Sequence, residues 1–205
     1  TKNRMVYRYD GYLVWSERVR EELLLGYPDA RRVPVYVVGA PQFDVFFQDR
    51  FSQSRAEFCR TQDLQPDKKI IVFALGSPNL FREHHAAIAL GKRVLRGELG
   101  DVQLLVRPHP QFDDGKEADA GRALGGPIRV QRTGEAGLKV AERFQDEQQI
   151  REWVNTFRHA DVVVNLSSTV SVDASIFDKP VVNLDYDPEP GQPNQALVKD
   201  VNHRW

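Results

Sequence analysis

Short apolar runs alternate with segments of helical period along this 205-residue chain, and this alternation restricts the fold more than any other feature of the sequence. A run of about four to eight apolar residues is typical of a buried strand, whereas apolar residues three and four apart are typical of one helix face. Strands that alternate with helices favour parallel pairing, because each helix returns the chain to the same edge of the sheet. The sequence therefore predicts an α/β fold with a doubly wound, mostly parallel sheet.

The clearest helix is predicted over 147–159, where the apolar side chains share one face and Asp146 can cap the amino end. Further helices are expected at 16–25, with Ser16 as the cap, at 82–95 and from Thr169 to Phe177. The predicted strands are 12–15, 35–38, 70–75, 102–107, 128–131, 161–166 and 180–184.

Three segments are expected along the chain. Residues 1–45 form the end of one α/β domain, 46–68 connect two domains, and 69–205 form the main α/β domain. The chain opens at Thr1 without an initiator Met and stops at Trp205 in a polar stretch. We therefore expect a piece of a longer polypeptide, in which the carboxyl-terminal part of the main domain is missing.

The composition excludes several classes of function. Lys and Arg number 28 against 29 Asp and Glu, so a formal net charge of −1 gives no general attraction to nucleic acid. The lone Cys59 excludes an internal disulfide and a thiolate zinc site. His84 and His85 are adjacent, which is the wrong spacing for two ligands on one helical face, so we expect neither a metal nor a cofactor.

Apolar runs in the sequence all fall short of the roughly 20 residues that span a bilayer, and the start has no hydrophobic signal core. We therefore expect no membrane span and a cytoplasmic protein, either free or peripheral to the inner face of the membrane.

Ligands of an open parallel sheet bind beyond the carboxyl ends of the strands, where the strand order reverses. If the main sheet has the order 3-2-1-4-5, strands 70–75 and 161–166 are neighbours. Gly76 and Ser77 would then lie beside Ser167, Ser168 and Thr169, and one crevice would contain both loops.

The turn at Ser167, Ser168 and Thr169 joins a strand to a helix, so free backbone N–H groups and three hydroxyls suit a phosphate. Helix capping explains one of these hydroxyls equally well, so both interpretations stay open. Gly76 allows a ligand to approach the backbone before Ser77, although a plain turn explains it as well and no dinucleotide fingerprint follows.

Two further positions can contact such a ligand. His109 stands between two prolines, which hold it so that it can donate to a phosphate or sugar oxygen, and the alternative is a solvated loop histidine. Arg107 can pair with phosphate or with a surface carboxylate. Asp173 can accept hydrogen bonds from two ribose hydroxyls, or it can be a helix-start acid that interacts with the helix dipole.

The sequence resembles the carboxyl-terminal domain of GT-B fold transferases. The motifs that carry this resemblance are 107–110, 160–169, Asp173 and 179–182. The resemblance is strongest to bacterial surface-polysaccharide glycosyltransferases and CDP-glycerol glycerophosphotransferases, and more distant to UDP-N-acetylglucosamine 2-epimerases. Residues 11–44 resemble the last part of the amino-terminal domain of the same enzymes. The resemblance implies a Rossmann-like half of a GT-B fold with a short remnant of a preceding α/β domain.

The resemblance also implies a function. The serine-rich turn would contact the diphosphate of a UDP- or CDP-linked donor, and Asp173 would bind the ribose of that donor. His109 would stabilise the departing diphosphate, without a metal. The acceptor would be a glycan or a lipid-linked molecule, and the catalytic base would lie in the missing amino-terminal domain, so the fragment alone should be inactive. Ser168 and Thr169 replace a glycine pair of the epimerases, which favours a transferase.

Two alternatives stay open. One is an epimerase or hydrolase on the same scaffold. The other is a non-enzymatic α/β interaction module. The lack of paired acids after strand 70–75, which would bind magnesium in a receiver-like module, argues against it.

Overall fold

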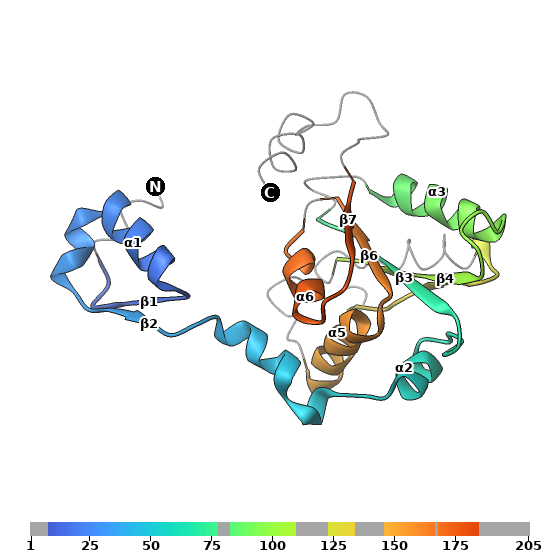
Figure 1. The fold of residues 1–205 in the computed structure, drawn as a ribbon, viewed down its shortest axis with the longest axis horizontal. Coiled ribbons are helices and arrows are strands. Elements are labelled where there is room, and N and C mark those ends of the chain that lie inside the picture. The colour runs from blue at the N-terminus through green and yellow to red at the C-terminus, as the bar shows by residue number, and fades with distance from the viewer. Residues whose placement is uncertain (1–7, 78–82, 110–122, 134–145, 167, 185–205) are drawn as a thin grey trace. The chain divides into compact units, whose positions relative to one another are not determined.

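The computed structural model describes residues 8–77, 83–109, 123–133, 146–166 and 168–184. The chain divides into two compact units, Thr1–Gln48 and Asp49–Trp205 (Figure 1). Each unit has its own parallel sheet.

The first unit contains a two-stranded parallel sheet. Strand β1 (Tyr12–Val14) pairs with β2 (Val35–Val37), and helix α1 (Glu17–Gly26) lies between them in sequence. The Ser16 hydroxyl accepts a hydrogen bond from the Val19 N–H at 3.3 Å, so Ser16 caps α1 as predicted. The 3₁₀ helices η2 (Pro28–Arg32) and η3 (Pro41–Phe47) also belong to this unit.

The second unit is built on a five-stranded sheet in which every pair is parallel. Its order is β5-β4-β3-β6-β7, which is the predicted order 3-2-1-4-5 of the strands in this unit. The doubly wound α/β fold class is therefore confirmed. The strands are β3 (Lys69–Ala74), β4 (Val102–Arg107), β5 (Ile128–Val130), β6 (Val162–Asn165) and β7 (Val181–Asn183).

Helices lie on both faces of this sheet. On one face α3 (His84–Leu95) packs on an apolar cluster that includes Phe73, Leu104 and Val164. The other face carries α5 (Glu147–His159), whose Thr156 hydrogen-bonds Gln131 beyond β5. Helix α6 (Val170–Ile176) contacts α5 and lies between β6 and β7 in sequence (Figure 1). Successive strand residues point to opposite faces, so both layers bury apolar side chains.

Helix α5 begins where the sequence predicts. The Asp146 side chain accepts from the Gln149 N–H at 2.7 Å, and the Gln149 side chain accepts in return from the Asp146 N–H at 3.3 Å. This reciprocal capping satisfies two backbone donors that the helix itself leaves unpaired. The apolar face of α5 buries Val154 and Phe157 completely.

Residues 49–68 lie within the second unit. They form the 3₁₀ helix η4 (Asp49–Phe51) and helix α2 (Arg55–Thr61), which packs against α5. Phe58 of α2 is fully buried. The role of 46–68 as a connection between domains stays a prediction.

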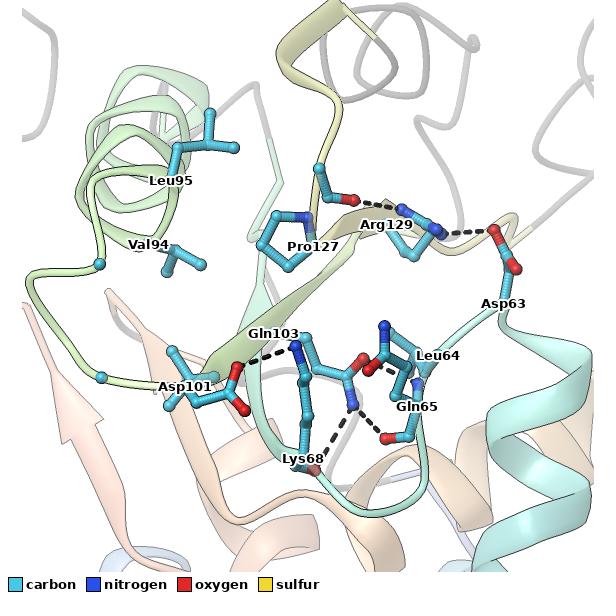
Figure 2. Close-up of a pocket in the computed structure, with 14 residues that line it drawn as sticks. Asp63, Leu64, Gln65, Lys68, Val94, Leu95, Asp101, Gln103, Pro127 and Arg129 are labelled. Atoms are coloured by element: carbon cyan, nitrogen blue, oxygen red, sulfur yellow. Dashed lines mark hydrogen bonds and ion pairs between the residues drawn. The ribbon is translucent and has the colours of Figure 1, made fainter.

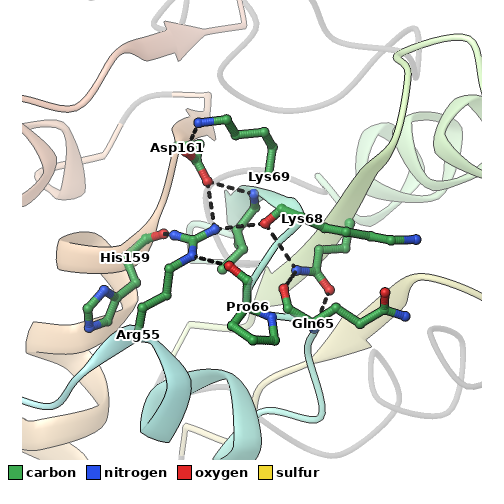
Figure 3. A network of polar contacts seen from close by, with 9 residues as sticks. Arg55, Gln65, Pro66, Lys68, Lys69, His159 and Asp161 are labelled. Atoms are coloured by element: carbon green, nitrogen blue, oxygen red, sulfur yellow. Dashed lines mark hydrogen bonds and ion pairs between the residues drawn. The ribbon is translucent and has the colours of Figure 1, made fainter.

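A polar network joins α2, α5 and the amino ends of β3 and β6 (Figure 3). The Arg55 guanidinium donates to the carbonyl oxygens of Pro66, Lys68 and His159 at 2.7 to 2.8 Å. It also donates to Asp161 Oδ2 at 3.0 Å, and that oxygen accepts from the Ile70 N–H at 2.9 Å. One side chain therefore satisfies backbone groups from two separate segments, the loop before β3 and the end of α5.

Replacing Arg55 should destabilise the second unit. Arg55→Ala takes a donor from three carbonyl oxygens, while the Asp161 carboxylate keeps the Ile70 N–H and Lys69, and we expect a loss of about 2 to 3 kcal/mol in the free energy of unfolding. Denaturant unfolding measures this loss. Arg60→Ala on the exposed side of the same helix is the matched control and should change stability by less than about 0.5 kcal/mol. Equal losses for the two variants would contradict this role of Arg55.

Candidate functional site

The loops that follow β3, β4 and β6 start side by side at one edge of the sheet. β3 pairs with both neighbours, with Ala74 opposite Arg107 and Phe73 opposite Val164. Leu75 follows Ala74, and Gly76 and Ser77 come next, both partly exposed. Ser167 lies outside the described residues. We call the residues that follow the three strands the carboxyl-end crevice, after the crevice that the sequence predicts at this edge.

Asn165 organises the turn after β6. Its side chain is fully buried; Oδ1 accepts from the Ser168 N–H at 3.0 Å, and Nδ2 donates to Ser171 Oγ at 3.1 Å. The Ser171 hydroxyl donates in turn to Asn183 Oδ1 at 3.3 Å. Asn165 therefore ties the turn to α6 and to β7. The sequence analysis missed it, although a polar residue that ends an apolar strand run was the available signal.

Ser168 and Thr169 differ in their surroundings. Ser168 Oγ accepts a long hydrogen bond of 3.4 Å from the Val170 N–H, so the capping interpretation of this hydroxyl has structural support. Thr169 is exposed at the amino end of α6 and makes no side-chain capping bond. Of these two residues, Thr169 is the more exposed to solvent.

Removing the Asn165 side chain should loosen this turn. Asn165→Ala leaves the part-buried Ser168 N–H and the Ser171 hydroxyl oxygen without this partner, and we expect a loss of about 1 to 3 kcal/mol in the free energy of unfolding. Thermal and denaturant unfolding measure it. Ser175→Ala, on the exposed face of α6, removes only a bond to the Val172 carbonyl and should cost less than about 0.5 kcal/mol. A neutral Asn165→Ala would show that the turn does not depend on this amide.

Glu83 reaches from the start of α3 to the end of β3. Its Oε2 accepts a hydrogen bond from the Gly76 N–H at 2.5 Å, and the residue is only 6% exposed. A Cβ on residue 76 would stand 3.0 Å from Glu83 Oε1, so glycine is what permits this approach. Burial raises the pKa of the Glu83 carboxyl to about 7, and the Gly76 N–H opposes that rise. The sequence analysis did not identify Glu83.

The raised pKa of Glu83 makes stability depend on pH. The folded state binds this proton more tightly than the unfolded chain, whose pKa is the ordinary 4.5, so the contribution of Glu83 to stability is fully present below about pH 4.5 and is lost as pH rises through 7. Glu83→Gln carries no charge at any pH. We expect it to be more stabilising, relative to the wild type, at pH 8 than at pH 5, by up to about 3 kcal/mol.

Unfolding curves at both pH values test this expectation. Glu147→Gln is the control, because the Glu147 side chain is 71% exposed, and its effect should be the same at both pH values. A Glu83→Gln effect that does not change with pH would contradict the raised pKa.

Arg107 lies beneath the crevice, on the side of α5. It is 9% exposed, and its one side-chain hydrogen bond to the described residues is a long contact of 3.4 Å from Nη1 to Gln131 Oε1. Burial lowers the pKa of the guanidinium to about 10, against the effect of the Asp173 and Glu152 carboxylates. Arg107 therefore stays charged at neutral pH and places a positive charge below the crevice.

Asp173 is enclosed rather than exposed. It is 5% exposed, and its Oδ2 accepts a hydrogen bond from the Trp153 indole N–H of α5 at 3.1 Å. Burial raises the pKa of the Asp173 carboxyl to about 6, and the Trp153 bond and the Arg107 charge oppose that rise. One oxygen of the predicted ribose acceptor is thus already engaged by Trp153.

His109 is half-buried after β4. Burial first, and the Arg107 charge second, lower the pKa of its imidazole below the usual 6.5, so the ring is neutral at pH 7. A neutral imidazole still has one N–H to donate. The backbone beside it is held by the Thr133 hydroxyl, which donates to the Pro108 carbonyl at 3.2 Å.

A cavity of about 360 Å³ lies at the opposite edge of the same sheet (Figure 2). It is lined by Val102 and Gln103 at the start of β4 and by Pro127 just before β5. Its charged side chains pair with each other, Lys68 with Asp101 at 2.8 Å and Arg129 with Asp63 at 2.7 Å. This cavity contains none of the predicted site residues.

In the described part of the chain, no three His, Cys, Asp or Glu side chains gather to hold a metal ion. The same part contains no helix whose length and apolar character would let it cross a membrane.

Comparison with known proteins shows the fold. No protein-family model and no curated protein sequence matches the chain, but solved structures do. The wall teichoic acid polymerase TagF matches with a TM-score of 0.54 and 18% identity, over 87% of this chain and 40% of that chain. UDP-GlcNAc 2-epimerase from Neisseria meningitidis, bound to UDP-GlcNAc, matches with a TM-score of 0.52 and 13% identity, over 85% and 44%. S. aureus MnaA with UDP matches with a TM-score of 0.53 and 15% identity, over 92% and 49%.

The second unit therefore has the Rossmann-like fold of a GT-B half, as the resemblance implied. The solved structures that share it are a polymerase of wall teichoic acid and sugar-nucleotide epimerases. This chain spans less than half the length of each of these three structures.

Proposed function

We propose that the second unit binds the nucleotide diphosphate donor of a glycosyl or glycerophosphoryl transferase that builds a surface glycan. The observation that supports this proposal is the parallel pairing of β3 with β6, which starts the Gly76 and Thr169 loops at one edge. Solved proteins of this fold have been determined with UDP-GlcNAc and with UDP. Ligands of such sheets bind at the point where strand order reverses, and here that point lies between β3 and β6.

The proposed chemistry is stabilisation of the leaving group. As the bond to the transferred group breaks, negative charge grows on the departing nucleoside diphosphate. The neutral His109 imidazole and the Thr169 hydroxyl donate hydrogen bonds to its oxygens, and the buried Arg107 charge adds a favourable field. In this proposal no divalent metal takes part, Ser77, Ser167 and Ser168 line the same site, and Asp173 offers its second oxygen to the ribose.

The amino-terminal part completes the proposal. The first unit is the end of an acceptor-binding domain that supplies the catalytic base, and the acceptor is a glycan or a lipid-linked molecule. Two exposed apolar side chains on the small sheet, Leu13 at 72% and Tyr36 at 57%, favour the view that more of this domain covers it. The protein would work in the cytoplasm, at the inner face of the membrane.

A sugar-nucleotide epimerase is the second candidate, because epimerase structures match this chain about as well as the polymerase does. Ser168 and Thr169 stand where the epimerases carry a glycine pair, which supports the transferase. Incubation of the full-length protein with UDP-GlcNAc discriminates between the two. Free epimerised sugar would favour the epimerase, whereas transfer to an added acceptor would favour the transferase.

Donor binding is tested by calorimetry on the full-length protein with UDP-GlcNAc and CDP-glycerol. We expect one of them to bind, and His109→Ala to weaken that binding about tenfold, which is the loss of roughly one hydrogen bond to a charged ligand. His85→Ala, at an exposed histidine of α3, is the control and should leave the affinity within about twofold. Binding that is equally strong in both variants would remove His109 from the site, and no heat with either donor would count against the proposed function.

A further inference from the structure

Glu83 is the buried group at the carboxyl-end crevice that the proposed function does not use. Its carboxyl group stands at the start of α3 and accepts a hydrogen bond from the Gly76 N–H in the loop after β3. An acid at the start of a helix is normally solvated and interacts with the helix dipole. This one is 6% exposed and carries its charge into the protein at the reversal point of the sheet.

The Glu83 carboxyl group lies so close to Gly76 that position 76 has no room for a side chain. A Cβ at position 76 would meet Glu83 Oε1 at 3.0 Å, so a side chain there would displace the carboxyl group. The N–H that a phosphate oxygen would use at this turn is already bonded to a carboxylate oxygen of the protein. A donor that enters the crevice therefore meets an internal anion beside its own binding groups.

We propose that Glu83 is a positioning residue of the donor site, which holds the turn after β3 through the Gly76 N–H and takes up one proton when the nucleotide diphosphate binds. This inference rests on the proposed function.

The physical reason is repulsion between like charges in a region with little water. A diphosphate ester is an anion, and an ionised carboxylate close to it disfavours binding. A proton from solvent removes the carboxylate charge. The neutral carboxyl group still accepts from the Gly76 N–H through its carbonyl oxygen, so the turn stays held. Binding and protonation therefore favour each other.

Other titratable groups lie on the neighbouring elements. They are Arg107 at the end of β4, His109 after it, Asp173 in α6, and His84 and His85 at the start of α3. The pKa of Glu83 is raised first by burial, and only the Gly76 N–H acts against this, so the carboxyl group is close to half-protonated near pH 7 before any donor binds. A proton taken up on binding near pH 7 is thus readily accepted by this group.

The test is calorimetry on the full-length protein with UDP-GlcNAc and CDP-glycerol, whose diphosphate esters do not titrate between pH 6 and 8. The wild type should bind about tenfold more weakly at pH 8 than at pH 6, because one proton is taken up by a group of pKa near 7. Titrations in two buffers of different ionisation enthalpy should give an uptake approaching one proton at pH 8. Glu83→Gln should bind with the same affinity at both pH values, within about twofold, and should take up no proton.

Glu147→Gln is the control and should keep the pH dependence of the wild type, because this exposed carboxylate is on α5 and pairs with Arg50. If Glu83→Gln does not fold, an NMR titration of the Glu83 carboxyl carbon in the wild type gives the answer, since its pKa must rise when donor is added. Donor binding without pH dependence, or with pH dependence that survives in Glu83→Gln, overturns this inference and leaves the proposed function standing. Absence of binding at every pH overturns both.

Discussion

The central position of β3 in the parallel sheet is the constraint on which the rest of the second unit depends. Ile70, Val72 and Phe73 are almost fully buried, because strands β4 and β6 pair on either side and helices lie on both faces. A shift in pairing by one residue would exchange the two faces of β4 and turn Arg107 toward the apolar cluster under α3. The hydrophobic pattern of β3 and β4 therefore also decides where the charged side chains at the carboxyl-end crevice point.

Charged side chains are paired at the amino edge of the sheet, whereas they are buried at its carboxyl edge. At the amino edge, Arg55 and Asp161 pair with each other and with backbone groups, and the charged side chains around the nearby cavity are paired as well. At the carboxyl edge, burial shifts the pKa of Glu83, Arg107 and Asp173 well away from their ordinary values. Ionisable groups held at such a cost are typical of functional sites rather than of surfaces that serve stability alone. Buried charge, rather than the size of a cavity, therefore distinguishes the carboxyl edge, at which the proposed site lies.

Much of the fold follows from local patterns in the sequence. The strands, the capped helix after Asp146 and the strand order come from apolar periodicity, capping residues and the topology rules for parallel sheets. The site is predicted less completely. Local patterns identify Ser168, Thr169 and His109 as loop residues at strand ends, but not the contacts of Asn165, Glu83 or Trp153. Those contacts join residues that lie 6, 7 and 20 positions apart, and local pattern specifies neither their distance nor their burial.

By itself, the sequence determined the class of fold, the alternation of elements and the edge of the sheet at which the loops after β3, β4 and β6 start, because these follow from periodicity and from the handedness of strand connections. Tertiary structure alone decided that Asp173 is covered by Trp153, that Arg107 is buried below the crevice and that Glu83 bonds Gly76. The physical reason is that burial and pKa depend on neighbours brought together by packing, and such neighbours are set by the whole sheet rather than by any one segment.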